Sequence, residues 1–371
     1  MRVDSLVLEH FRNISEMEFF PVSGVNVIFG ENAQGKTNLL EAIWLFTGMK
    51  SFRNTKEKDL ISFGQQRARM ELSYFNDSRE QTAEILIQEK KKVSIGGISY
   101  PSSSALCGEF LGVIFSPGHL NLIKGSPAER RKFLNTALCQ IKPTYTANLT
   151  KFNRILQQRN MLLKDIPYHS ELLDTLEIWD ETFSSLSASL IFSRKEYLGE
   201  MKGFLEDFYG GIAGGKEQIS LSYFSSSDKP LEGQTKEELR EEISLLLKET
   251  RKEDLLSGCT AIGPHRDDLV IELNHLPVKT FGSQGQQRSC ALSLKMAEAA
   301  IVHQKTGKQP VALLDDVMSE LDQSRQDFLL NHIEGWQVFI TCCEPSHILL
   351  SKTENNGNLF QMKEGKLCSS I

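Results

Sequence analysis

Short apolar runs alternate with polar turns along the first hundred or so residues, a pattern typical of strands in a mixed α/β lobe. The runs that predict buried strands are Leu6–Leu8, Val25–Phe29, Met70–Tyr74, Ile85–Ile87 and Leu111–Phe115. Apolar residues also recur at helical spacing and predict one helix, with a face formed by Leu39, Leu40, Ile43 and Trp44.

The pattern changes to long helical spacing from about Leu120 to Ser257. Thr235 and Glu238 predict a capping box at the start of one of these helices. Glycines 210, 211, 214 and 215 predict one loop, and serines 225–227 predict another. The middle of the chain is therefore expected to be a helical insertion of roughly 135 residues, without the sustained heptads of a long coiled coil.

Strand-like runs return after the insertion, at Leu269–Leu273, Val311–Leu314 and Val338–Ile340. The two ends of the chain are thus expected to fold together. We expect residues 1–119 and 257–371 to form one head and residues 120–256 to form the inserted domain.

Composition fits an ordinary globular protein: 371 residues, 40% hydrophobic and 24% charged. No apolar run approaches the roughly 18 residues that cross a bilayer, so we expect a cytoplasmic protein without a membrane partner. The seven cysteines are scattered without metal-binding spacing and are expected to be reduced.

Residues Gly30–Thr37 form a complete G-x-x-x-x-G-K-T phosphate loop between the predicted strand and helix. Backbone N–H groups of such a loop surround phosphate oxygens, Lys36 offsets the charge of the outer phosphates, and Thr37 offers its hydroxyl to Mg²⁺. We therefore expect ATP and Mg²⁺ as cofactors, with ATP held by Gly30, Glu31, Asn32, Ala33, Gln34, Gly35, Lys36, Thr37 and Asn38.

Two carboxylates end the predicted strand Val311–Leu314. Asp315 stands where a Mg²⁺-organising carboxylate faces the phosphate loop, so Thr37 and Asp315 are the expected metal ligands. Asp316 is expected to orient the attacking water, which makes Lys36, Asp315 and Asp316 the catalytic candidates. Because Asp is shorter than Glu, we expect slow hydrolysis.

A third element is the polar turn Gly282–Ser289, which opens a helix and presents a hydroxyl and N–H groups to an anion. With the segment Ser319–Asp322, it looks like an ABC-type ATPase, in which the signature turn of one subunit closes over ATP held by the other. The candidates for this contact are Ser283, Gly285, Gln286 and Asp322, and the protein is expected to form a homodimer with ATP.

Nine segments together resemble the RecF family of bacterial recombination mediators: His10–Asn13, Gly30–Thr37, Leu40–Ile43, Lys50–Arg53, Phe115–Pro117, Lys124–Arg131, Gly263–Asp268, Ser283–Arg288 and Leu314–Asp322. The resemblance implies an α/β, ABC-type (SMC/Rad50-like) ATPase head with an inserted, mainly helical second domain. It also implies weak DNA-dependent ATP hydrolysis, binding to double-stranded and gapped DNA, and the partners RecR and RecO, which help load RecA in recombinational repair.

Several positions depart from the family pattern or allow two interpretations. Gly118, His119 and Asn135 stand where the family usually has acidic residues, so the roles of those groups do not carry over. Thr341 ends the switch strand, where transporter ATPases have a γ-phosphate-sensing His. Arg12 either touches the nucleotide or belongs to a polar turn. Gly263–Asp268 predict a rigid turn that shapes the signature region.

Nine Lys or Arg residues and one acid, Glu129, lie between Lys124 and Lys164, inside a chain whose formal net charge is −6. Such a patch binds DNA phosphates without reading bases. The expected DNA contacts are Lys124, Arg130, Arg131, Lys132, Lys151, Arg154 and Arg159. The alternatives are a solvated helical face and, for Arg130 and Arg131, ion pairs within the fold.

Three other functions use part of the same pattern. A transporter ATPase subunit would have a standard Leu-Ser-Gly-Gly-Gln and no long helical insertion. A structural SMC-type head would carry coiled-coil arms. A P-loop kinase would use Lys36 and Thr37 but would have no use for Ser283 of a second copy.

Overall fold

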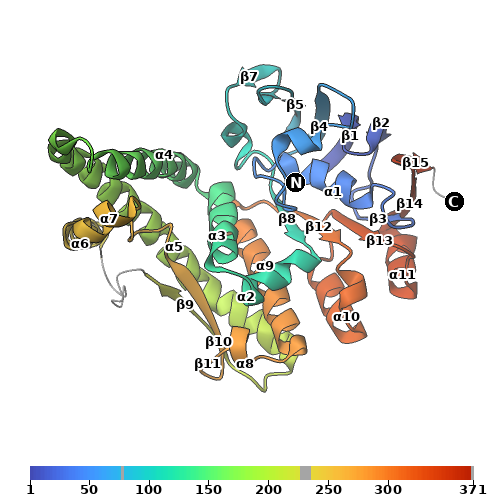
Figure 1. Cartoon of the computed structure of the whole chain (residues 1–371). Coiled ribbons are helices and arrows are strands. Elements are labelled where there is room, and N and C mark those ends of the chain that lie inside the picture. The colour runs from blue at the N-terminus through green and yellow to red at the C-terminus, as the bar shows by residue number, and fades with distance from the viewer. Residues whose placement is uncertain (77–78, 226–234, 369–371) are drawn as a thin grey trace. The chain divides into compact units, whose positions relative to one another are not determined.

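The computed structural model describes residues 1–76, 79–225 and 235–368 and divides the chain into two compact units (Figure 1). The first unit contains Met1–Leu120, Asp207–Lys216 and Arg288–Ile371. The second contains Asn121–Glu206 and Glu217–Gln287. Among the described residues, no helix is both long enough and apolar enough to cross a membrane.

The first unit holds two six-stranded sheets. The antiparallel sheet has the order β2-β1-β4-β5-β6-β7, with β1 (Arg2–Phe11), β2 (Ile14–Phe19), β4 (Ala68–Phe75), β5 (Glu80–Ile87), β6 (Lys92–Ile95) and β7 (Ile98–Tyr100). The mainly parallel sheet has the order β15-β14-β3-β13-β12-β8, with β3 (Val25–Phe29), β8 (Gly112–Phe115), β12 (Val311–Asp315), β13 (Val338–Cys342), β14 (Gly357–Lys363) and β15 (Lys366–Cys368).

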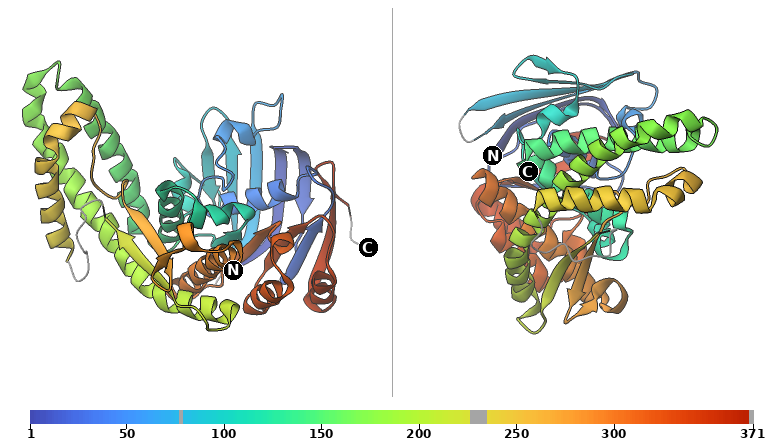
Figure 2. Two further views of the ribbon diagram at one scale, coloured as in Figure 1. Left: turned by 60° about the horizontal axis from the view of Figure 1, so that its bottom comes forward. Right: turned by 90° about the vertical axis from the view of Figure 1, so that its left-hand side faces the viewer.

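Helices pack on both faces of the parallel sheet. Helix α1 (Lys36–Leu45) shares one core with the antiparallel sheet and with Val311 and Leu313 of β12. Ala312 and Leu314 point to the opposite core, because side chains alternate along a strand. That core is covered by α9 (Gln284–Thr306), α10 (Gln323–His332) and α11 (His347–Asn356) (Figure 2). Short 3-10 turns of this unit are η1 (Glu57–Leu60), η2 (Ser103–Leu106), η3 (Pro117–Leu120) and η5 (Met318–Glu320).

The second unit is mainly helical, with one three-stranded sheet in the order β11-β10-β9. Its strands are β9 (Ile219–Phe224), β10 (Asp268–Leu273) and β11 (Leu276–Pro277). Its helices are α2 (Asn121–Lys124), α3 (Pro127–Ile141), α4 (Pro143–Asp165), η4 (Ser170–Thr175), α5 (Leu176–Ala213, which runs on into the first unit), α6 (Lys236–Glu249), α7 (Arg251–Ser257) and α8 (Val278–Phe281).

The expected α/β head with a mainly helical second part is confirmed, and so is the capping box of Thr235 and Glu238. The compact units divide differently from the predicted domains, because β10 pairs with β9 and residues 257–287 thus fall in the second unit. The loop predicted at Gly210 and Gly211 is wrong: α5 continues through both residues, and a Cβ at Gly211 would lie 2.5 Å from the Phe328 ring. Residues 226–227 of the predicted serine loop lie outside the described chain.

Candidate functional site

The phosphate loop connects β3 to α1, as the pattern predicted. Gly30 and Gly35 have φ angles of +149° and +114°, which only glycine adopts without strain. A Cβ would lie 2.3 Å from the Met362 carbonyl oxygen at Gly30 and 2.9 Å from Asn13 Oδ1 at Gly35. Both glycines therefore fit the loop tightly against its neighbours, with the N-terminus of α1 directed at the space inside it.

Lys36 is almost completely buried under this loop. Its Nζ donates hydrogen bonds to the carbonyl oxygens of Gly30 at 2.6 Å and Glu31 at 2.8 Å. These contacts hold the ammonium group against the loop. Gln34 faces another way: its Oε1 accepts from the Glu364 N–H at 2.6 Å, in the turn between β14 and β15.

Two threonine hydroxyls hold the carboxylate of Asp315 at the end of β12. Thr37 Oγ1 and Thr341 Oγ1 donate to the same oxygen, Oδ1, at 2.8 and 2.9 Å. Burial raises the pKa of the Asp315 carboxyl above its ordinary value, and the two hydrogen bonds oppose that rise. Thr341 faces Asp315 because β12 and β13 are parallel neighbours in this register.

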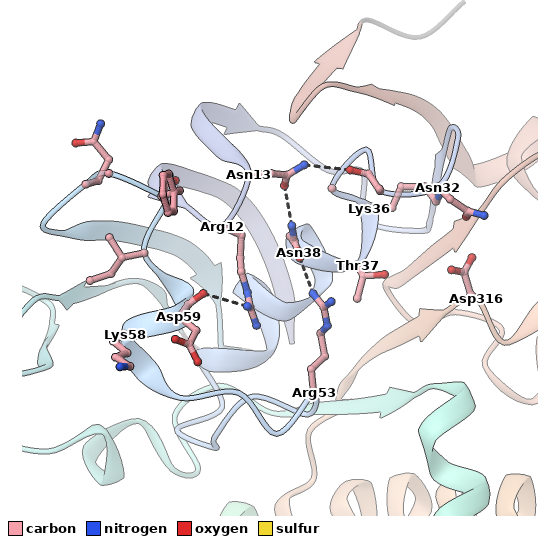
Figure 3. A pocket seen from close by; sticks show the side chains of 17 residues that line it. Arg12, Asn13, Asn32, Lys36, Thr37, Asn38, Arg53, Lys58, Asp59 and Asp316 are labelled. Carbon is pink, nitrogen blue, oxygen red and sulfur yellow. Dashed lines mark hydrogen bonds between the residues drawn. The ribbon is translucent and has the colours of Figure 1, made fainter.

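Asp316 follows in a left-handed conformation, with φ +51°. Its N–H donates to Thr341 Oγ1 at 3.0 Å, so one hydroxyl contacts both acidic residues. A side chain rarely adopts this backbone conformation, and such positions cluster at functional sites. Figure 3 shows Asp316 facing the same pocket as Thr37.

Arg12 forms a wall of the pocket through contacts with the protein itself. Its guanidinium donates to both carboxylate oxygens of Glu41 at 2.9 and 3.0 Å, to Thr55 Oγ1 at 2.7 Å and to the Asp59 carbonyl at 3.0 Å. Glu41 is fully buried and also accepts from Ser51. The sequence interpretation missed Glu41 as a site residue, although a carboxylate on an apolar helix face is a signal for a buried partner.

A chain of hydrogen bonds crosses the pocket mouth (Figure 3). Arg53 donates to Asn38 Oδ1 at 2.8 Å, and Asn38 donates to Asn13 Oδ1 at 2.7 Å. Asn13 donates in turn to the Ala33 carbonyl at 3.3 Å. Arg53 thus lies at this pocket.

The pocket has a volume of about 890 Å³ and is lined by Arg12, Asn13, Asn32, Ala33, Gly35–Asn38, Arg53, Lys58, Asp59, Ile61–Gln65 and Asp316. The lining residues fit a nucleoside triphosphate. The backbone of the glycine-containing phosphate loop, the ammonium group of Lys36 and the N-terminus of α1 converge on one side of the pocket. Thr37 and the Asp315 carboxylate supply the oxygen ligands that Mg²⁺ prefers.

Ser283, Gly285 and Gln286 belong to the second unit, where Ser283 and Gln286 form a reciprocal cap on α9. The Gln286 N–H donates to Ser283 Oγ at 3.3 Å, and the Ser283 N–H donates to Gln286 Oε1 at 2.7 Å. Gln286 Nε2 also donates to Glu217 at 2.5 Å. Gly285 lies in the first turn of the same helix. Asp322, in the first unit, caps α10 by accepting the Arg325 N–H at 3.0 Å.

Two of the seven predicted DNA contacts are wrong. Arg159 is completely buried and pairs with Asp180 and Asp254 at 2.8 and 2.7 Å. Arg130 is buried and pairs with Asp268 at 2.7 Å. Their guanidinium groups are committed to the fold of the second unit, since a buried charge requires its partner.

The other predicted DNA contacts differ in exposure. Lys124, Lys151 and Arg154 are exposed, and Lys132 is half-buried. Arg131 is half-buried and donates to the Asp267 carbonyl at 2.8 Å, and burial lowers the pKa of its guanidinium. The three exposed side chains are open to a phosphate, and the two half-buried ones present only part of their surface to one.

The turn Gly263–Asp268 is fixed by a buried polar network. Arg194 donates to the Pro264 carbonyl at 2.7 Å, and Tyr223 donates to Asp267 at 2.5 Å. Asn135 Oδ1 accepts from Arg194 at 3.0 Å, which gives that departure from the family pattern a structural role. His119 is another departure from the family pattern, and its Nδ1 accepts a hydrogen bond from the Ser116 N–H at 3.0 Å.

Comparisons with known proteins agree with this geometry. Residues 2–108 match the family model of the RecF/RecN/SMC N-terminal domain. The chain is 40% identical to the DNA replication and repair protein RecF of Acetivibrio thermocellus, covering 93% of this chain and 94% of the relative. It is 39% identical to RecF of Ruminiclostridium cellulolyticum over the full length of both.

Solved structures give the same result. The recombination mediator protein RecF with ATP, from the RecFOR pathway, superposes with a TM-score of 0.93 at 34% identity, covering 100% of this chain and 97% of that one. An Smc head domain from Pyrococcus furiosus superposes with a TM-score of 0.54 at 15% identity, covering 100% of this chain and 96% of that one, and shows a shared fold.

Proposed function

Because the chain belongs to the RecF family of DNA replication and repair proteins, we propose that its pocket binds ATP with Mg²⁺ and that ATP joins two copies of the chain on DNA. The observation that carries this proposal is the hydrogen bond from Thr37 to Asp315. It unites the phosphate loop with the carboxylate strand, the two halves of a P-loop nucleotide site.

The phosphate loop supplies the binding groups. Its backbone N–H groups and the α1 N-terminus receive phosphate oxygens, and Lys36 balances their charge. Thr37 and Asp315 are the proposed ligands of Mg²⁺, which when bound neutralises charge on the outer phosphates. Thr341 keeps the Asp315 carboxylate oriented toward that position.

Asp316 is the proposed water-positioning residue. Its backbone is fixed by Thr341, and its carboxylate lines the pocket beyond Thr37. A short carboxylate reaches less far than that of Glu, so we propose weak, DNA-dependent hydrolysis that ends the ATP-bound state.

The dimer is proposed to form around the nucleotide. Ser283, Gly285 and Gln286 of a second copy would close over the outer phosphate, with Asp322 at the same interface. The reciprocal cap of Ser283 and Gln286 uses the serine oxygen as an acceptor and leaves its O–H to donate to an anion. This role separates the proposal from that of a P-loop kinase, which needs no second copy.

The proposed DNA surface consists of Lys124, Arg131, Lys132, Lys151 and Arg154. These side chains would neutralise phosphates of duplex and gapped DNA without reading sequence. The similar solved protein is named a recombination mediator of the RecFOR pathway. We therefore propose RecR and RecO as partners, with RecA loading as the outcome. Because the proposed partner is bacterial DNA, we also propose the cytoplasm as the location.

Equilibrium binding of ATP and of gapped duplex DNA tests this function. The protein should bind ATP, and its affinity for DNA should be higher with ATP than with ADP. Lys36→Met should lose both properties, because outer-phosphate charge is left without compensation. Equal DNA affinity with ATP, with ADP and without nucleotide would contradict the proposal.

A further inference from the structure

Phe63 is a large apolar side chain left fully in solvent. Its exposure is 106% of the reference value, and it lines the nucleotide pocket. A phenylalanine of this unit would gain stability from burial in either neighbouring core. Its position at the pocket, outside both cores, calls for a ligand that covers the ring.

The backbone around Phe63 is firmly held. The Arg12 N–H donates to the Leu60 carbonyl, and the Ser62 N–H donates to the His10 carbonyl, each at 2.8 Å. Residue Ile61 between them forms an antiparallel bridge to the end of β1. The loop is thus attached to the antiparallel sheet immediately before the exposed ring.

Phe63 occupies the corner of a tight turn. The Gln65 N–H donates to the Ser62 carbonyl at 3.0 Å, and Gly64 has φ +79°. A type II turn requires this conformation at its third residue, which is why glycine follows Phe63. The turn fixes the backbone of Phe63 and leaves its side chain uncovered, which is how a preorganised contact is built.

The two sides of the pocket differ in chemistry. Figure 3 shows Lys36, Thr37 and Asp316 on one side and Lys58 and Asp59 on the other. The first side carries the groups that suit phosphates and Mg²⁺. The second side is continued by the turn that carries Phe63, which suits a flat and weakly polar group. A nucleotide has its phosphates and its base at opposite ends.

We propose that Phe63 is the stacking platform for the base of the bound nucleotide. This inference rests on the proposed binding of ATP. An aromatic ring stacks on any base, because every base has a π-face. Phe63 therefore supplies affinity for a nucleoside triphosphate over inorganic polyphosphate, without choosing between adenine and guanine.

Binding of ATP and of inorganic tripolyphosphate, each measured with Mg²⁺ by calorimetry, separates the base contact from the phosphate contacts. Phe63→Ala should weaken ATP binding roughly 5- to 150-fold, the usual effect of losing one base stack, and leave tripolyphosphate binding unchanged. Phe63→Trp should retain ATP affinity, whereas Phe63→Leu should not, because a leucine is apolar without a ring. Phe20→Ala removes another exposed phenylalanine of the same unit, 64% exposed and outside the pocket, and should change neither affinity.

Three results would overturn the inference alone: wild-type ATP affinity in Phe63→Ala, equal weakening of ATP and tripolyphosphate in that variant, or full ATP affinity in Phe63→Leu. A wild-type protein that binds neither compound would overturn the proposed function, and the inference with it. Retention of full affinity by Phe63→Leu would replace stacking with simple apolar cover.

Discussion

Thr37 donates a 2.8 Å hydrogen bond to Asp315, although 278 positions separate the two residues in the chain. Thr341 donates to the same carboxylate oxygen from the neighbouring strand. Burial disfavours the charged form of this carboxylate, and the hydrogen bonds from the two hydroxyls oppose that effect. Magnesium and nucleotide binding should therefore depend on Thr341, which does not line the pocket.

Thr341→Val tests that dependence. Valine matches the shape of threonine but leaves the buried carboxylate with one hydrogen-bond donor fewer. This should destabilise the charged form of the Asp315 carboxylate by about 1 to 3 kcal/mol. We expect the Mg²⁺ concentration that half-saturates ATP binding to rise, while Thr341→Ser restores it. Unchanged magnesium dependence in the valine variant would show that Thr37 alone orients Asp315.

Glu217 should control the signature turn through Gln286. Glu217→Ala removes the acceptor of the Gln286 amide and loosens the cap that orients Ser283. We expect ATP-dependent dimerisation roughly five-fold weaker, corresponding to about 1 kcal/mol for one hydrogen bond. ATP binding by the monomer should stay unchanged.

Glu217→Gln is the matched control, because its amide oxygen still accepts from Gln286. It should dimerise as wild type. If Glu217→Gln is weakened as much as Glu217→Ala, the charge at position 217 matters and the hydrogen bond does not. Wild-type dimerisation by Glu217→Ala would contradict the prediction.

Two arginines of α4 should separate folding from DNA binding. Arg159→Met removes the ion pair of the buried Asp254 and leaves Asp180 with Arg251 alone, which should cost about 3 to 5 kcal/mol of unfolding free energy. Arg154 is exposed on the same helix, so Arg154→Met should change stability by less than about 0.5 kcal/mol.

Salt titrations of DNA binding complete this comparison. Arg154→Met should lower the slope of log affinity against log salt by about one, as expected for one lost phosphate contact. An unchanged slope would remove Arg154 from the proposed surface, and a stable Arg159→Met would contradict its structural role.

His265 should make the second unit sensitive to acid. Burial lowers the pKa of its imidazole to about 4, and neighbouring arginines add to the effect. The unfolded chain, with a histidine pKa of about 6.5, binds more protons between these values, so stability falls as pH drops through this window. From pH 7 to pH 5 the loss is about 2 kcal/mol.

Denaturant unfolding of His265→Gln at pH 7 and pH 5 checks this sign. The variant should lose less stability than wild type over the same interval, because glutamine does not titrate. An equal loss in both proteins would show that other groups cause the acid sensitivity.

The nucleotide elements were predictable from sequence because each is local: a glycine loop, a strand ending in Asp315, a turn opening a helix. Contacts between residues that are distant in the chain were not predictable from the sequence. A run of Lys and Arg looks the same whether its members face solvent or, as Arg159 does, pair with Asp254 in the interior. The place of residues 257–287 depended on β10 pairing with β9, and no local pattern encodes that pairing.

Glu41 and Phe63 are two further residues whose surroundings could not be predicted from the sequence. Each has the wrong polarity for its expected place, a carboxylate in the core and an aromatic ring in solvent. Only the folded arrangement shows that Arg12 covers the first and that the nucleotide pocket adjoins the second.

The mass of the protein in solution tests the central claim, that ATP joins two copies through the signature turn. With ATP and Mg²⁺ the wild-type protein should have the mass of a dimer, and with ADP that of a monomer. Ser283→Arg should bind ATP yet stay monomeric. A dimer that forms equally with ADP, or that persists in Ser283→Arg, would contradict the account.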